Sequence, residues 1–256
     1  MRDWFDRFVS LDPHPKHSYN QDNLKSKQRT LDELRLHRGH GGPRIGAGRP
    51  AAKRPPVHHV RRPSVPRGCP AHVTLRVRPD VPSLRNKRFV NEFRRSLARG
   101  AERGEFRVVE FSIQRDHAHL IVEAAGKPAL GRGMKSVGAR FARAVNRTFG
   151  RSGPVLFGRY HLHLLTTPRE VRNALAYVLL NARKHFRQRR GAVPPVAIDE
   201  ASSGRWFDGW KKGRASTARA SDAPVATARS WLLRVGWRRH GLIDPAEVPG
   251  VRGVGR

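Results

Sequence analysis

Two histidines, His117 and His119, stand two residues apart in the segment RDHAHLIVEA. The residues around them predict a strand over 117–124, so both imidazoles project from one face while the apolar residues point to the other. Two imidazoles on an open sheet face suit a divalent metal whose remaining positions stay free for a substrate. A chance pair of surface histidines is the alternative, because the chain has 13 histidines.

A second pair with the same spacing, His161 and His163, occurs in the segment RYHLHLL. The strand expected there, over 154–165, lies at the edge of the sheet in the fold described below. The pair also precedes Tyr177 by only fourteen residues, too few to face that side chain across the sheet easily. We therefore rank this pair below His117 and His119 as metal ligands and expect one of the two to touch nucleic acid.

Tyr177 lies on a helix expected from Pro168 to about Arg187, whose apolar residues form one stripe at helical spacing. The tyrosine falls off that stripe and shares a polar side with Asn181, one turn further on, and Lys184. A tyrosine packed on the sheet edge is the structural alternative. The neighbouring amide and cation favour a role in chemistry.

The elements that must position these residues follow the order β-α-β-β-α-β, then α. The bounds of the strands and helices are predicted from apolar residues at alternating or helical spacing and from the Gly and Pro residues that interrupt this spacing. The strands are expected at 71–78, 105–114, 117–124 and 154–165, and the helices at 84–103, 128–149 and 168–187. This order predicts an α+β, ferredoxin-like split βαβ fold, an antiparallel sheet with helices on one face. The strand 117–124 is then central.

The composition points to a polyanionic partner. The chain has 256 residues, with 52 Lys and Arg against 20 Asp and Glu, a formal charge of +32, which phosphates relieve best. A single cysteine, Cys69, excludes a disulfide framework and a Cys-based zinc site. No apolar window is long enough for a membrane helix, and no signal-peptide pattern opens the chain, so we expect a cytoplasmic, nucleoid-associated protein.

Three segments divide the chain. Residues 1–70 are basic, rich in Pro and Gly, and expected to be largely disordered. Residues 71–187 carry the predicted fold and the candidate site. Residues 188–256 form a basic extension in which short apolar patches alternate with Gly and Ser, and its tryptophans are expected to dock on the domain.

The segments RDHAHLIVEA, FGRYHLHLL and YVLLNARKH, in this order, resemble the HUH single-tyrosine transposases, and most closely the REP-associated tyrosine transposases. The resemblance covers about residues 71–187. It implies that His117 and His119 bind Mg²⁺ or Mn²⁺, that Asn181 completes the metal site and that Tyr177 is the nucleophile. One departure is the small Ala118, where the family prefers a bulky apolar residue.

The reaction implied by the resemblance is cleavage and rejoining of single-stranded or hairpin DNA through a 5′-phosphotyrosine intermediate. A phenol attacks well only where a metal or cations such as Lys184 favour the phenolate. A domesticated protein that binds DNA hairpins without cleaving them is the alternative function. An RNA-binding module of the same fold is disfavoured, because strand 117–124 carries histidines where stacking aromatics are expected. The resemblance leaves monomer and homodimer open.

Two basic regions are candidates for holding the DNA. Arginines recur at helical spacing along the second helix and its end and are expected to follow phosphates. They are Arg140, Arg143, Arg147 and Arg151. In the first segment, Gly-Arg-Pro around Arg49 is similar to the core of AT-hook segments, which place an arginine in a minor groove. A solvated basic face is the alternative for any single arginine.

Overall fold

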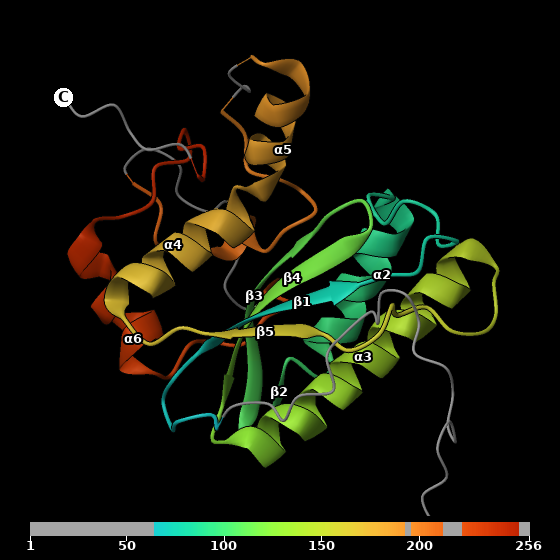
Figure 1. Cartoon of the computed structure of the whole chain (residues 1–256), viewed down its shortest axis with the longest axis horizontal. Coiled ribbons are helices and arrows are strands. Elements are labelled where there is room, and N and C mark those ends of the chain that lie inside the picture. Colours follow the sequence, from blue (N-terminus) through green and yellow to red (C-terminus); the bar gives the residue numbers. More distant parts are fainter. Residues whose placement is uncertain (1–63, 193–195, 212–221, 251–256) are drawn as a thin grey trace, which may run out of the picture. The chain divides into compact units, whose positions relative to one another are not determined.

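A computed structural model describes residues 64–192, 196–211 and 222–250 of the chain. The prediction for Arg49 and most of the predicted disordered segment lie outside the described residues. The described part is built around one antiparallel sheet (Figure 1).

The sheet has the order β2-β3-β4-β1-β5. Its strands are β1 (Ala71–Arg76), β2 (Glu102–Arg103), β3 (Phe106–Ile113), β4 (His117–Ala124) and β5 (His161–Leu164). All neighbours are antiparallel. The predicted ferredoxin-like arrangement is confirmed, with β1 and β4 in the centre and β5 at the edge. The two-residue strand β2 extends the other edge.

One face of the sheet carries two long helices, α2 (Lys87–Ala98) and α3 (Lys127–Phe149), as Figure 1 shows. The side chain of Asn86 caps α2, and Gly150 ends α3 in the left-handed conformation with φ 59°. Ala118, Leu120 and Val122 of β4 are buried in the core beneath these helices. Their position confirms that the histidines of β4 face the opposite side.

Three predicted elements differ from the observed ones. The helix expected over 84–103 covers only 87–98, because it starts after the Asn86 cap and stops before Gly100. The strand expected over 154–165 pairs only over 161–164, since the preceding loop makes one isolated bridge, between Leu156 and Val77, the residue after β1.

The helix expected over 168–187 is two helices, α4 (Pro168–Leu179) and α5 (Asn181–Arg190). Leu180 separates them with φ −108° and ψ 12°, outside helical geometry. The break coincides with a change of sequence, because α4 buries an apolar stripe and α5 is almost entirely polar. A uniform helical spacing hides such a break.

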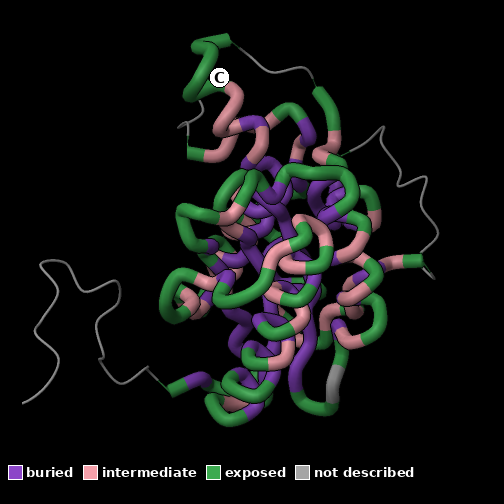
Figure 2. The backbone as a smooth tube through the Cα atoms, turned by 90° about the vertical axis from the view of Figure 1, so that its right-hand side faces the viewer, coloured by how far each residue is buried: buried purple, intermediate pink, exposed green. Residues whose placement is uncertain are grey.

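The second face of the sheet is partly covered by α4 and the C-terminal extension. The extension contributes two 3₁₀ turns, η2 (Gly204–Trp206) and η4 (Gly236–His240), and the short α6 (Trp231–Arg234). Together they form a second core with α4, whose extension residues are Phe207, Trp210, Leu233, Trp237 and Ile243. Figure 2 shows the buried backbone running through the middle of the molecule. Trp210 and Trp237 therefore dock on the domain as expected, whereas Trp231 is 49% exposed.

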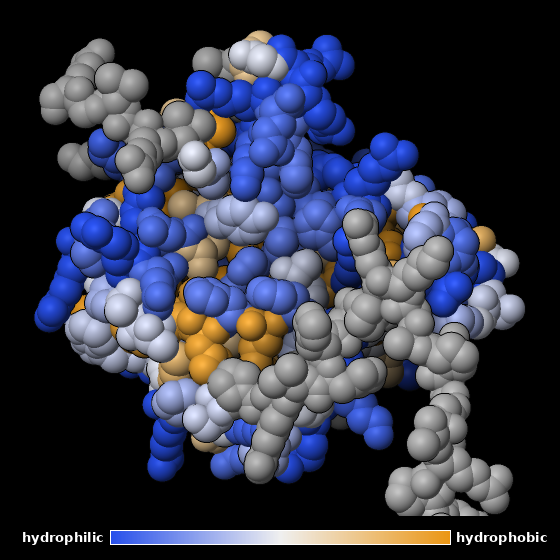
Figure 3. Space-filling model, viewed as in Figure 1, coloured by the Kyte–Doolittle hydropathy of each residue, from blue (hydrophilic) through white to orange (hydrophobic). Residues whose placement is uncertain are grey.

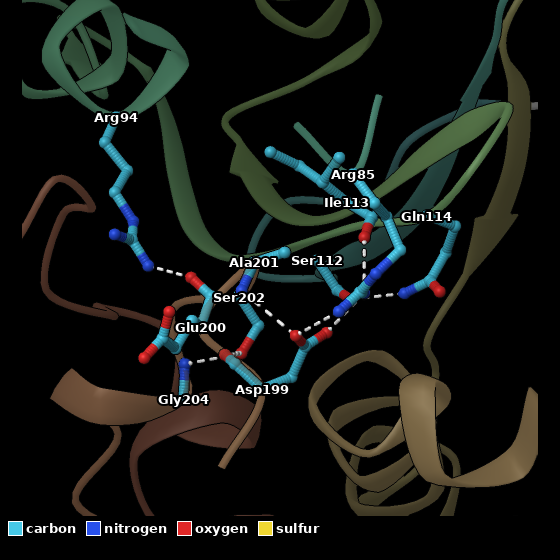
Figure 4. Close-up of polar contacts among 10 residues, drawn as sticks. All are labelled: Arg85, Arg94, Ser112, Ile113, Gln114, Asp199, Glu200, Ala201, Ser202 and Gly204. Atoms are coloured by element: carbon cyan, nitrogen blue, oxygen red, sulfur yellow. Dashed lines mark hydrogen bonds and ion pairs between the residues drawn. The ribbon is translucent and has the colours of Figure 1, made fainter. Parts of the chain in front are cut away.

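Polar contacts also fasten the extension to the first core. The guanidinium of Arg85 donates to both carboxylate oxygens of Asp199, at 2.9 and 2.7 Å, and to the carbonyl of Ile113 at 3.1 Å (Figure 4). The Ile113 N–H donates to the Ala201 carbonyl at 2.8 Å, continuing the edge of β3. A forked arginine contact of this kind fixes the orientation of the extension as well as its position.

Among the described helices, none is long and apolar enough to cross a membrane.

Candidate active site

His117 and His119 open β4 on the sheet face opposite α2 and α3. His119 is buried and His117 is half-buried. Their Nε2 atoms face each other at 3.0 Å, and the ring centroids are 4.6 Å apart. The i, i+2 spacing has therefore brought the two imidazoles together as the sequence predicts.

Each of these histidines has a partner on its other ring nitrogen. The Nδ1 atom of His117 lies 2.7 Å from a carboxylate oxygen of Asp116. The Nδ1 atom of His119 lies 3.0 Å from Nε2 of His72 and 3.2 Å from the hydroxyl of Thr74, both on β1. Such outer contacts orient metal-binding imidazoles in proteins. Neither His72 nor Thr74 is predicted from the sequence as a site residue.

Burial keeps the imidazoles of His119 and His72 neutral. It lowers the pKa of His119 to about 2, helped by the neighbouring His72 and His117. Burial likewise lowers the pKa of His72 to about 4, with the histidines of β5 adding to the effect. A neutral imidazole presents a lone pair, which is the form that binds metals. At neutral pH, His119 and His72 are therefore in this form.

Tyr177 lies on α4 with its ring against the histidines. Its ring centroid is 5.1 Å from that of His119 and 5.7 Å from that of His72, both edge to face. The ammonium of Lys184 lies 4.8 Å from the centre of the tyrosine ring. Burial raises the pKa of the Tyr177 phenol, so the phenol is protonated at neutral pH.

The local sequence explains how α4 presents this tyrosine. Thr167 and Glu170 form a capping box at its start, and Pro168 occupies the first turn. The apolar stripe of α4, including Val171, Leu175 and Val178, is buried in the second core. Tyr177 is off that stripe and only half-buried, and it lines a hollow of about 1000 Å³ together with His72 and His163.

Asn181 is the first residue of α5 and is completely buried. Neither the oxygen nor the nitrogen of its side-chain amide has a hydrogen-bond partner among the residues that the structure describes. A buried amide without partners costs roughly 1–3 kcal/mol, so such a group in a folded protein calls for a ligand or an ordered solvent molecule.

The chemistry of these residues fits a divalent ion. Two ligand atoms at a right angle, each about 2.1 Å from one ion, are about 3.0 Å apart in octahedral geometry, which is the observed separation of the two Nε2 atoms. The amide oxygen of Asn181 is of a ligand type that such an ion accepts, and it has no hydrogen-bond partner among the described residues. No group of three or more His, Cys, Asp or Glu among the described residues is arranged to hold a metal.

The second histidine pair lies on the same face of the sheet. His163 is paired with His72 across β1 and β5, and His161 is paired with Thr74. Paired residues share a face, so the two histidine pairs are separated by one strand. His161 and His163 are exposed, unlike His119.

Arginines of α3 line a hollow on the opposite side of the molecule, between α2 and α3. Arg140, Arg143 and Arg147 contribute from α3, and Arg95 and Arg99 join them from α2, around a volume of about 300 Å³. Glu92 in the same hollow pairs with Arg147 and Arg95. The hollow is therefore lined by the predicted arginines of α3 and by two further arginines that the sequence did not predict.

Arg151 behaves differently from the other three arginines, because its guanidinium pairs with Asp80 at 2.6 Å and it does not line the hollow. Figure 3 shows that hydrophilic side chains dominate the face seen in that view.

Residues 67–178 match the family model described as IS200-like transposase. This range contains both histidines of β4 and Tyr177. The resemblance expected from the three motifs is thereby confirmed over this segment, and a transposase-like role in DNA processing is the class of function that it supports.

One solved structure similar to this chain is that of a REP-associated tyrosine transposase bound to a REP hairpin. It shares 15% identity with a TM-score of 0.39, and the match covers 57% of this chain and 96% of the other. No curated protein sequence matches the chain.

Proposed function

We propose that this chain is a metal-dependent tyrosine transposase that cleaves and rejoins single-stranded or hairpin DNA. The observation that carries the proposal is the convergence of two imidazole Nε2 atoms at 3.0 Å, with the ring of Tyr177 packed against one of the imidazoles. The match of residues 67–178 to IS200-like transposases supports the same reaction class.

In the proposed step, the oxygen of Tyr177 attacks the scissile phosphorus. The new bond joins the phenolic oxygen to phosphorus, and the bond from phosphorus to the 3′-oxygen breaks. The phenolic proton leaves the tyrosine, and the departing 3′-oxygen takes up a proton. The product is a 5′-phosphotyrosine and a free 3′-hydroxyl. A later attack by a 3′-hydroxyl reverses the step without ATP, because the tyrosine link retains the phosphodiester energy.

The residues of the site divide this work. His117, His119 and Asn181 would hold a Mg²⁺ or Mn²⁺ ion, which when bound supplies charge stabilisation for the phosphate oxygens. Asp116 orients the imidazole of His117. Burial of the Tyr177 phenol raises its pKa, so the attacking form needs positive charge near the oxygen.

Lys184 supplies a positive charge close to Tyr177. Its ammonium lies over the ring of Tyr177, and there it would also attract an incoming phosphate.

DNA outside the cleavage point would be held by arginine contacts. The hollow between α2 and α3 gathers five arginines against one glutamate, a balance that favours phosphates. Arg140, Arg143 and Arg147 of the hollow are the proposed contacts, and Arg151 would have to leave Asp80 to join them.

The test is a covalent-adduct assay. Labelled hairpin oligonucleotides taken from repeats flanking the native gene are incubated with the full-length protein and Mn²⁺ or Mg²⁺. Denaturing gels then resolve any protein–DNA adduct. Tyr177→Phe and chelation by EDTA should each abolish the adduct. Tyr160→Phe is the matched control, because Tyr160 lines a separate hollow between α3 and the segment leading into β5, and it should leave the adduct intact.

Two results would contradict the proposal. An adduct that persists in Tyr177→Phe would assign the nucleophile to another residue. Tight hairpin binding with no adduct at any metal concentration would favour the second candidate, a domesticated DNA-binding protein. The observation that favours this second candidate is that the phenol of Tyr177 is half-buried and protonated.

A further inference from the structure

The outer ring nitrogen of His119 faces strand β1. Thr74 is directly opposite His119 in the antiparallel register, and His72 lies two residues earlier on the same face. The distances from Nδ1 of His119 are 3.0 Å to Nε2 of His72 and 3.2 Å to the Thr74 hydroxyl. One ring atom of a candidate metal ligand therefore has two polar neighbours from the adjacent strand.

The proton positions on the two candidate ligands follow from their partners. A carboxylate only accepts hydrogen bonds, so His117 carries its proton on the Nδ1 that faces Asp116, and its Nε2 is bare. For His119 to bind the same ion through Nε2, its proton must likewise sit on Nδ1. That arrangement requires an acceptor at Nδ1.

We propose that His72 is a positioning residue. It accepts a hydrogen bond from the Nδ1–H of His119 and so keeps the Nε2 of His119 unprotonated toward the ion. This inference rests on the metal site of the proposed function. The imidazole of His72 is suited to the role because its neutral form offers one lone pair, at the Nε2 atom that lies nearest. The same ring contacts Tyr177 edge to face, at 5.7 Å between centroids.

The opposite tautomer makes a different prediction. If His72 and Thr74 both donated to His119, the proton of His119 would sit on Nε2. The 3.0 Å contact between the two Nε2 atoms would then be a hydrogen bond from His119 to His117. In that arrangement neither atom is free for a cation.

Three variants of the full-length protein separate these roles. His72→Phe keeps an aromatic ring beside Tyr177 but has no acceptor. His72→Gln places an amide oxygen near the position of Nε2. Thr74→Val removes the hydroxyl and preserves the side-chain shape. The affinity for Mn²⁺ is measured without DNA, from the loss of the free-ion signal in electron paramagnetic resonance.

We expect Mn²⁺ affinity to fall about 10- to 100-fold in His72→Phe, the usual effect of losing an outer-shell partner. His72→Gln should restore the affinity to within about threefold of the wild type, and Thr74→Val should have a smaller effect than His72→Phe. In a second measurement, ¹⁵N NMR of the wild type saturated with Mg²⁺ should show the proton of His119 on Nδ1.

The outcomes are distinguishable. Wild-type affinity in a folded His72→Phe overturns the role of His72 alone. Equal losses in the Phe and Gln variants also overturn it, because the acceptor would then be irrelevant. A proton on Nε2 of His119 in the Mg²⁺-bound wild type does so even if His72→Phe fails to fold. Failure of the wild type to bind Mn²⁺ overturns the metal site of the proposed function, and the role of His72 with it.

Discussion

Glu110 is a buried carboxyl whose protonation links the sheet to the C-terminal extension. It lies on β3 at an irregularity of the strand and is only 7% exposed. The hydroxyl of Ser203 donates to one carboxyl oxygen at 2.5 Å and accepts from the Phe111 N–H at 2.8 Å. Burial raises the pKa of Glu110 to about 8, against a lowering by Ser203 and a further rise from Asp208. The carboxyl is therefore protonated at neutral pH.

The sign of the resulting pH dependence follows from linkage. The ordinary pKa of 4.5 applies to the unfolded chain, and about 8 applies to the folded protein. Between these values the folded protein holds a proton that the unfolded chain has lost, so stability falls as the pH rises. At about 1.4 kcal/mol per pH unit, the loss between pH 4.5 and 8 is at most roughly 5 kcal/mol. Below pH 4.5 the contribution is complete.

Glu110→Gln should remove this dependence, because an amide resembles the protonated acid and its oxygen can still accept from the Ser203 hydroxyl. We expect the variant to match the wild type at pH 5 and to exceed it by several kcal/mol at pH 8.5. Urea unfolding at intervals between pH 5 and 9 measures both. Glu105→Gln is the control, since that carboxyl is largely exposed and its removal should leave the wild-type slope. A Glu110→Gln variant with the wild-type slope, or one less stable at pH 8.5, would refute the reasoning.

Three further predictions test the packing and the DNA contacts. Gly133→Ala should destabilise the fold by about 1–3 kcal/mol, because a Cβ there would be 2.1 Å from the ring of Phe106. Gly131→Ala, on the same helix with open space, should be neutral or stabilising by up to about 1 kcal/mol in the same urea assay. Trp237→Ala should cost about 3–5 kcal/mol, measured by urea unfolding, because the side chain is fully buried in the second core. Arg143→Gln should weaken hairpin binding and reduce the slope of log affinity against log salt by about one; an unchanged slope would exclude a phosphate contact.

The fold was predictable where local signals and packing agree. The turn at Arg115 and Asp116 and the apolar alternation placed strand 117–124 correctly. Pro128 and Gly150 bracket α3, whose apolar spacing continues between them. Both signals depend only on residues close together in the chain, so they can be read from the sequence without knowing the fold.

The second core was not predictable in detail, because its parts are far apart in sequence. Trp210 and Trp237 sit in short, Gly-interrupted segments that have no periodicity of their own. They become buried only because α4 offers an apolar stripe on the open face of the sheet. The sequence pattern indicated that tryptophans dock, yet not the surface that receives them.

The candidate site shows the same limit at the level of single residues. His117 and His119 are recognisable because a period of two lies within one strand. Tyr177 and Asn181 are recognisable by a separation of four, although the break at Leu180 places them on different helices. His72 has no such signal. Its relation to His119 depends on the register between β1 and β4, and a shift of one residue would turn its side chain to the opposite face. Register is fixed by the packing of the whole sheet, so the residues that orient a ligand from a neighbouring strand emerge only when that sheet is assembled.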